Sequence, residues 1–128
     1  MSLVLDAGAL IALERGDRRM TTIVADARRH GERLVVPAGV LAQVWRDGRR
    51  QALIARLVRA PLCAVRSLND ADARSVGHLL GATTQVDVVD ASVVIAARAV
   101  ADNGRAQVVT SDPDDLARLD PTLELTIV

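Results

Sequence analysis

Aromatic side chains are almost absent from this sequence. Among its 128 residues there is no Phe and no Tyr, and Trp45 is the one Trp. The core must therefore be built from aliphatic side chains. Base stacking on aromatic platforms, which RRM-type modules and many single-strand-binding proteins use, is nearly unavailable to such a chain. The composition argues against both classes of nucleic-acid-binding module.

Lysine is absent as well, so all sixteen basic residues are Arg, and the net charge is zero. The charge is nevertheless unevenly distributed. Residues 15–66 hold twelve Arg and four acids, whereas residues 67–128 hold four Arg and ten acids. Two interpretations stay open: solvated helix faces, or a basic wall for a polyanion beside an acidic pocket for cations.

Cysteine and long apolar runs are scarce. The single Cys63 has no partner for an internal disulfide, and we expect it to be a small core residue in a reducing cytoplasm. No apolar run is long enough to span a bilayer, and no basic segment precedes the first apolar run. These features predict a cytoplasmic protein without a membrane partner. A length of 128 residues predicts a single domain over residues 1–128.

Short apolar runs alternate with helical patterns along the whole chain. Strands are expected at 3–6, 33–37, 62–67, 106–112 and 123–128. Helices are expected at 7–17, 18–31, 37–48, 49–60, 69–84, 88–104 and 113–120, and those at 37–48 and 49–60 should form a hairpin. Strands that are apolar on both faces indicate a parallel sheet covered by helices on both sides. The predicted fold is α/β, a three-layer sandwich around a mostly parallel sheet of about five strands.

Several acids fall where such a fold would bring them together. Asp6 ends the first expected strand, in an otherwise aliphatic run, and Asp112 ends the fourth. Asp87 and Asp90 are three residues apart at the start of a helix and therefore share a face. Asp115 lies in the short helix after the fourth strand. Because ligands of open parallel sheets bind beyond the carboxyl ends of the strands, these acids are predicted to converge there.

Carboxylates that share a crevice repel one another and need a cation to stay charged. Mg²⁺ and Mn²⁺ prefer oxygen ligands, keep water molecules for chemistry, and stabilise the charge that develops in phosphodiester hydrolysis. Structural alternatives stay open for some of the acids. Asp87, Asp114 and Asp115 are also good helix caps, and Asp112 before Pro113 suits a turn. Asp6 has the fewest structural alternatives.

Four segments together resemble a PIN domain: "LVLDAGALIAL", "VPAGVLAQVWR", "DVVDASVVIAARA" and "VVTSDPDDLARL". The chain is most similar to the small toxin ribonucleases of bacterial VapBC-type toxin–antitoxin modules. This resemblance implies a Mg²⁺- or Mn²⁺-dependent endoribonuclease with one or two ions, a homodimer, RNA as substrate, and a small VapB-like antitoxin as partner. It assigns the catalytic, metal-binding acids to Asp6, Asp90 and Asp112, with Asp115 as a neighbouring acid and Asp87 as an additional candidate.

The second acid of the family pattern is missing, because Gln43 occupies its position in "VLAQVWR". An amide oxygen can still coordinate an ion but carries no charge. Under the resemblance, Gln43 implies reduced activity, a ligand set shifted to Asp87, or a PIN-fold protein that binds without turnover. A plain surface glutamine is an equally open interpretation.

Other polar residues are weaker candidates. Thr110 and Ser111 stand beside Asp112, and a hydroxyl there either orients a metal-bound water or satisfies the end of the strand. Possible phosphate contacts are Arg46, Arg49 and Arg50. We expect His30 and His78 to be surface or cap residues and Trp45 to be a core or dimer contact. The apolar face of 49–60 is a candidate partner surface.

Three other functional classes lack their defining residues. A phosphoacceptor receiver domain resembles this chain in size and strand-end acids, but it needs an acidic pair after the first strand and a late Lys. A haloacid-dehalogenase-type phosphatase needs a second Asp at the position of Gly8. No P-loop pattern is present. The open choice is therefore between an active metal-dependent ribonuclease and an inactive PIN-fold binding protein.

Overall fold

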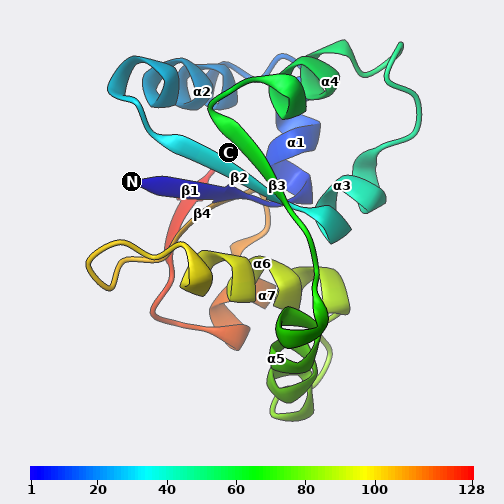
Figure 1. Ribbon diagram of the computed structural model, residues 1–128, viewed down its shortest axis with the longest axis vertical. Coiled ribbons are helices and arrows are strands. Elements are labelled where there is room, and N and C mark those ends of the chain that lie inside the picture. Colours follow the sequence, from blue (N-terminus) through cyan, green and yellow to red (C-terminus); the bar gives the residue numbers. More distant parts are fainter.

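The computed structural model describes residues 1–128 as an α/β fold with one central sheet (Figure 1). The strands are β1 (Ser2–Leu5), β2 (Arg33–Pro37), β3 (Cys63–Arg66), β4 (Gln107–Thr110) and β5 (Glu124–Ile127). The helices are α1 (Ala7–Glu14), α2 (Arg18–His30), α3 (Ala38–Val44), α4 (Ala52–Arg59), α5 (Asp70–Gly81), α6 (Val88–Ala99) and α7 (Pro113–Leu119). None of these helices has both the length and the apolar character that a membrane crossing requires.

All five strands are parallel, in the order β3-β2-β1-β4-β5. In the centre of the sheet Val4 of β1 is paired with Val35 of β2 and with Val108 of β4. Helices α1, α2 and α4 lie on one side of the sheet, and α6 with α5 and α7 lies on the other (Figure 1). The predicted three-layer α/β sandwich is confirmed, with every strand parallel.

The core is aliphatic, as the lack of aromatic residues predicts. Its largest fully buried side chains come from the sheet and from both helical layers: Leu5, Leu10, Met20, Leu34, Ile54 and Leu116. Helix α6 is the central helix of its layer, because six of its residues are buried. Trp45 and Cys63 are partly buried and pack against this core, and burial raises the pKa of the Cys63 thiol to about 11.

The ends of two helices and the packing of α3 against α4 differ from the sequence prediction. Helix α3 ends at Val44, because Trp45 adopts an extended backbone. Helix α6 ends at Ala99 rather than near residue 104, because Asn103 and Gly104 form a left-handed turn that pairs Asp102 with Arg105. The expected hairpin is also wrong, since α3 and α4 each pack on α1 rather than on each other.

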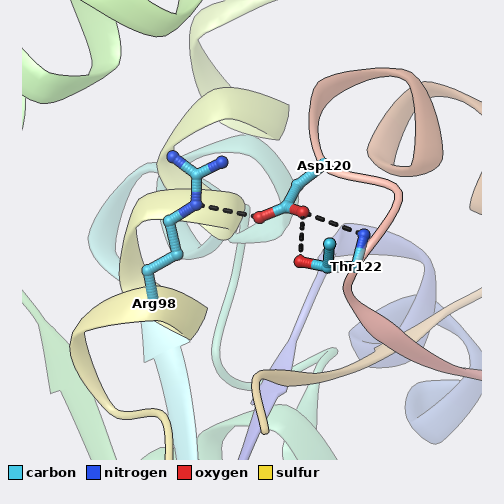
Figure 2. A network of polar contacts seen from close by, with 3 residues as sticks. All are labelled: Arg98, Asp120 and Thr122. Atoms are coloured by element: carbon cyan, nitrogen blue, oxygen red, sulfur yellow. Dashed lines mark hydrogen bonds and ion pairs between the residues drawn. The ribbon is translucent and has the colours of Figure 1, made fainter. Parts of the chain in front are cut away.

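Long-range polar contacts join these layers. The Glu14 carboxylate at the end of α1 accepts a hydrogen bond from the Ile54 amide of α4 at 3.0 Å, where α4 has no side-chain cap of its own. On the opposite side of the sheet, Asp120 accepts hydrogen bonds from Arg98 of α6 and from the amide and hydroxyl of Thr122 (Figure 2). The connection from α7 to β5 is thereby tied to α6.

Candidate functional site

The order in which strands are added to the sheet reverses between β1 and β4, although all strands remain parallel. Strands β2 and β3 extend the sheet on one side of this point, and β4 and β5 extend it on the other. In parallel α/β folds, such a switch point opens a crevice at the carboxyl ends of the two central strands. Asp6 directly follows β1, and Asp112 lies two residues after β4. Both residues were expected to end their strands, but the strands stop at Leu5 and Thr110.

Asp6 is buried, with only 8% of its surface exposed, and it is the N-cap of α1. Its carboxylate accepts a hydrogen bond from the Ala9 amide at 2.9 Å. Burial raises its pKa, with a further contribution from Asp112, and hydrogen bonds from Thr110, Ala9 and Gly8 offset this only in part. The cap gives the Asp6 carboxylate a structural role, but it does not cancel the effect of burial on the pKa. An Asp just before a helix start is a recognisable capping signal, which the sequence interpretation of Asp6 missed.

Thr110 lies at the end of β4, beside the acids that follow the two central strands. This residue is fully buried, and its hydroxyl accepts a hydrogen bond from the Asp112 amide at 2.9 Å. The same hydroxyl acts to lower the pKa of Asp6. It therefore satisfies a backbone amide just after β4. Ser111, the other candidate hydroxyl, is exposed.

Gly8 permits a close approach between α1 and the segment after β4. A Cβ atom at this position would lie 2.8 Å from the Ser111 Cβ and 3.0 Å from the Ser111 backbone nitrogen. Such distances are too short for any side chain, so the two segments can meet only at a glycine. Sequence reasoning missed this role, because the approach joins residues that are about a hundred positions apart.

The start of α6 contributes two more acids. Asp87 is exposed and is the N-cap of α6, where its carboxylate accepts a hydrogen bond from the Asp90 amide at 2.8 Å. Asp90 is half-buried. Burial, followed by the negative charges of Asp87, Asp115, Asp6 and Asp112, raises the pKa of Asp90 to about 6. The fold therefore brings the five predicted acids close enough for four of them to act on the fifth.

The acids after β4 differ in their surroundings. Asp112 is exposed and occupies the N-cap position of α7, but its side chain makes no capping hydrogen bond. Asp115 is half-buried and forms an ion pair with Arg118 at 3.3 Å. Asp114 is exposed and does not contribute to the raised pKa of Asp90. Of the two neighbouring acids in α7, Asp115 is the one whose charge acts on Asp90.

The donor chemistry of this group suits a hard divalent cation, since it consists of carboxylate oxygens with few compensating cations. The positions of the side chains do not form a complete ligand set: no three His, Cys, Asp or Glu side chains are close enough together to hold a metal ion. The larger cavities of the molecule are lined by other residues. The acids range from buried Asp6 to exposed Asp87 and Asp112. Binding an ion would require these carboxylates to turn toward one another.

Gln43 lies exposed on α3, and its side chain makes no hydrogen bond. It is one helical turn beyond Gly39, which faces Ser92 and Val89 of α6. Residues four apart share a helix face, so Gln43 is on the side of α3 that is turned toward α6. The structure thus places Gln43 near α6, the helix that carries Asp90, and the Gln43 side chain makes no hydrogen bond that would fix its position.

The three candidate arginines are not equivalent. Arg46 donates hydrogen bonds to the carbonyl oxygens of Trp45 at 2.7 Å and Ala42 at 3.4 Å, and so caps the end of α3. Arg49 and Arg50 are exposed, and their guanidinium groups make no hydrogen bond or ion pair. His30 and His78 are exposed on α2 and α5, as expected.

Comparison with protein-family models and with curated proteins finds no match to the chain. The resemblance to PIN-domain toxins therefore remains a prediction from the four sequence segments. What the structure adds is the parallel α/β fold and the position of the acids within it.

Proposed function

We propose that this protein is a metal-dependent endoribonuclease of the PIN-domain toxin type, which hydrolyses RNA phosphodiester bonds at the carboxyl edge of β1 and β4. One observation carries the proposal. Asp6, Asp90 and Asp112 come from three distant parts of the chain and lie close enough to affect one another. Burial first, then Asp87 and Asp115, and last Asp6 and Asp112 raise the pKa of Asp90 to about 6. Perturbed carboxyl groups clustered at a switch point are typical of functional sites.

In this proposal Asp6, Asp90 and Asp112 hold one or two Mg²⁺ or Mn²⁺ ions, with Asp87 and Asp115 beside them. A bound ion of this kind activates water and stabilises the charge on the phosphate oxygens. The protein positions the ligands: the Ala9 amide orients Asp6, and the Thr110 hydroxyl favours its charged form. The Asp87 side chain fixes the first turn of the helix that carries Asp90.

The second candidate is a PIN-fold protein that binds RNA or a partner without cleaving. Gln43 favours it, because the position that the family gives to an acid is here uncharged and free of structural hydrogen bonds. One negative charge fewer weakens cation binding at that side of the group.

The proposal also includes a homodimer and a small antitoxin as partners. An apolar groove of about 240 Å³ between α2 and α4 supports a protein partner, because Leu13, Val24, Leu53 and Leu57 line it and Arg28 and Arg56 flank it. Leu53 is 37% exposed in the isolated chain. Such a groove suits an amphipathic segment with acidic flanks.

A nuclease assay on RNA with Mn²⁺, and with EDTA as the blank, separates the two candidates. The Asp6→Asn variant is the sharpest loss-of-charge test, because Asn retains an oxygen that can cap α1. Cleavage by the native chain that falls at least about 100-fold in Asp6→Asn supports the nuclease, because losing even an outer-shell partner of a metal ligand costs about 10- to 100-fold. The Asp26→Asn variant, which changes an exposed acid of α2, should cleave like the native chain.

The Gln43→Glu variant tests the alternative. Cleavage by Gln43→Glu with none by the native chain would support a binding protein that has lost turnover. Absence of cleavage in both, with no change in Mn²⁺ binding between native chain and Asp6→Asn, would contradict the metal-dependent mechanism.

A further inference from the structure

The segment between α3 and α4, residues 45–51, carries Arg46, Arg49 and Arg50 and belongs to no regular element. It begins at the end of α3, which itself starts at the carboxyl end of β2. The seven residues of α3 span only about 10 Å. The segment therefore extends outward from the same edge of the sheet as the acids, as the loop beyond α3 in Figure 1 shows.

The Gln51 side chain bonds to the backbone at the start of this segment. The Gln51 Oε1 accepts hydrogen bonds from the Arg46 amide at 2.8 Å and the Asp47 amide at 3.1 Å. Its Nε2 donates to the Val44 carbonyl oxygen at 2.7 Å, one of the groups left without a partner where α3 ends. Gln51 thus bonds to three backbone groups, and most of its hydrogen-bonding capacity is used.

The rest of the segment is equally well ordered by its own contacts. The Asp47 carboxylate accepts a hydrogen bond from the Arg49 amide at 2.9 Å, and the Asp47 carbonyl oxygen accepts from the amides of Arg50 and Gln51. Gly48 lies against the Trp45 ring, where a Cβ would be 2.9 Å from the ring. The backbone is therefore folded before any ligand arrives.

The charges of the segment are divided between two tasks. Arg46 and Asp47 are bonded to the backbone, whereas the guanidinium groups of Arg49 and Arg50 are exposed and unpaired. Because the backbone of the turn is already folded, binding of phosphate by Arg49 and Arg50 would order only their side chains and not the chain that carries them. Arginines that only keep a helix face soluble would not need a backbone ordered in this way.

We propose that residues 45–51 form a preformed arm that presents Arg49 and Arg50 to the phosphate backbone of an RNA strand lying across the carboxyl edge, with Gln51 as its positioning residue. This inference rests on the proposed function, because that function supplies RNA as the ligand. Arg46 belongs to the scaffold of the arm and not to its binding face.

The scaffold is tested by amide hydrogen exchange. Gln51→Ala removes both acceptor bonds, so the Arg46 and Asp47 amides should exchange faster while amides in the sheet keep their protection. Gln51→Glu keeps the acceptor oxygen but loses the Nε2 donor to the Val44 carbonyl, so it should protect the two amides less than the native chain and more than Gln51→Ala. Unchanged exchange in Gln51→Ala would overturn the positioning role.

RNA binding is measured in EDTA, with a labelled single-stranded RNA, as a function of salt concentration. Log K falls as log salt rises, and each lost phosphate contact makes this slope shallower by about 0.7 on a single strand. We expect the double variant Arg49→Ala with Arg50→Ala to make the slope shallower by about 1.4. Gln51→Ala alone should have a similar effect. The triple variant should have no larger effect than the double variant. Melting curves show that each variant is folded at the assay temperature.

Arg18→Ala with Arg19→Ala is the matched control, since it removes two exposed arginines from the start of α2. It should leave the slope unchanged. If RNA binds but its salt dependence is unchanged in the Arg49, Arg50 and Gln51 variants, or changes as much in the control, this inference is overturned and the proposed function is not. No RNA binding by the native chain would overturn RNA as the ligand of the proposed function.

Discussion

At the scale of single residues, the two innermost acids are in different situations. Asp6 is the more deeply buried, but its charge is supported by the Ala9 amide, the Gly8 amide and the Thr110 hydroxyl. No hydrogen bond compensates the Asp90 side chain, and four other carboxylates oppose its charge. The residue whose ionisation is opposed by all its surroundings, and which a bound cation would stabilise most, is therefore Asp90.

Replacing Asp90 by Asn should stabilise the protein in the absence of metal. Because the native pKa is about 6 and the ordinary value is 3.8, native stability falls as pH rises from about 4 to about 6. We expect Asp90→Asn to gain about 1–3 kcal/mol at pH 7.5 in EDTA, and to lose most of this advantage at pH 4.5. Thermal melting at the two pH values measures both effects.

The control for this prediction is Asp70→Asn, which changes an exposed acid paired with Arg74 in the first turn of α5. It should show no gain at pH 7.5. Equal stability of the native chain and Asp90→Asn at pH 7.5 would mean that the neighbouring carboxylates do not act on Asp90.

At the scale of elements, the site depends on how closely α1 approaches the turn between β4 and α7. Gly8 and Ser111 are in direct contact, and the Thr110 hydroxyl accepts a hydrogen bond from the Asp112 amide and acts to lower the pKa of Asp6. Two loops that are distant in sequence are thereby held as one unit. The geometry of the acids is therefore a property of this contact and not of either loop alone.

Gly8→Ala should disrupt this contact. The Ser111 hydroxyl can rotate away from a new Cβ, but the Ser111 Cβ and backbone nitrogen cannot, so we expect a loss of about 1–3 kcal/mol in the free energy of unfolding. Adding Ser111→Gly should restore part of that loss. Urea unfolding measures both changes.

Gly77→Ala provides the matched control, because a Cβ there meets nothing within 4 Å in the middle of α5. It should stabilise the protein by up to about 1 kcal/mol through helix propensity. If Gly8→Ala is as stable as the native chain, the two loops are free to separate.

At the scale of the whole molecule, the β5 side of the sheet is fastened by Asp120. Its carboxylate accepts from Arg98 Nε at 2.9 Å, from the Thr122 amide at 2.9 Å and from the Thr122 hydroxyl at 2.6 Å (Figure 2). Burial raises the pKa of Asp120, but these hydrogen bonds outweigh it, so its pKa lies below the ordinary value. The ionised carboxylate therefore stabilises the folded state.

The contribution of Asp120 should depend on pH in the opposite sense to that of Asp90. A lowered pKa supplies stability that is present above about pH 4 and is lost as pH falls through the native pKa. Because Arg98 is about half exposed, we expect Asp120→Asn to cost only about 1 kcal/mol at pH 7. The gap from the native chain should close in acid, as measured by urea unfolding at pH 7 and pH 3.

Asp26→Asn is the comparison, because Asp26 and Arg29 form an exposed pair. It should change stability by less than about 0.5 kcal/mol at either pH. A constant difference between native chain and Asp120→Asn from pH 7 to pH 3 would show that the charge of Asp120 does not contribute.

The sequence by itself determined the fold class and the convergence of the acids. Alternation of apolar runs with helical patterns requires a parallel sheet between helices, and a parallel sheet brings all its carboxyl ends to one edge. It did not determine where α3 and α6 end, because Trp45 and the turn at Asn103 and Gly104 decide this through local backbone conformation.

Only the tertiary structure decided which side chains contact or electrostatically affect one another. Asp115, and not Asp114, acts on the charge of Asp90. Gly8 lets Ser111 approach α1 closely, and the Gln51 side chain accepts hydrogen bonds from the Arg46 and Asp47 amides. The first two depend on distances across the fold, and the third on the bend after α3. Hydrophobic periodicity reports which face of an element is buried, and it carries no information on such contacts.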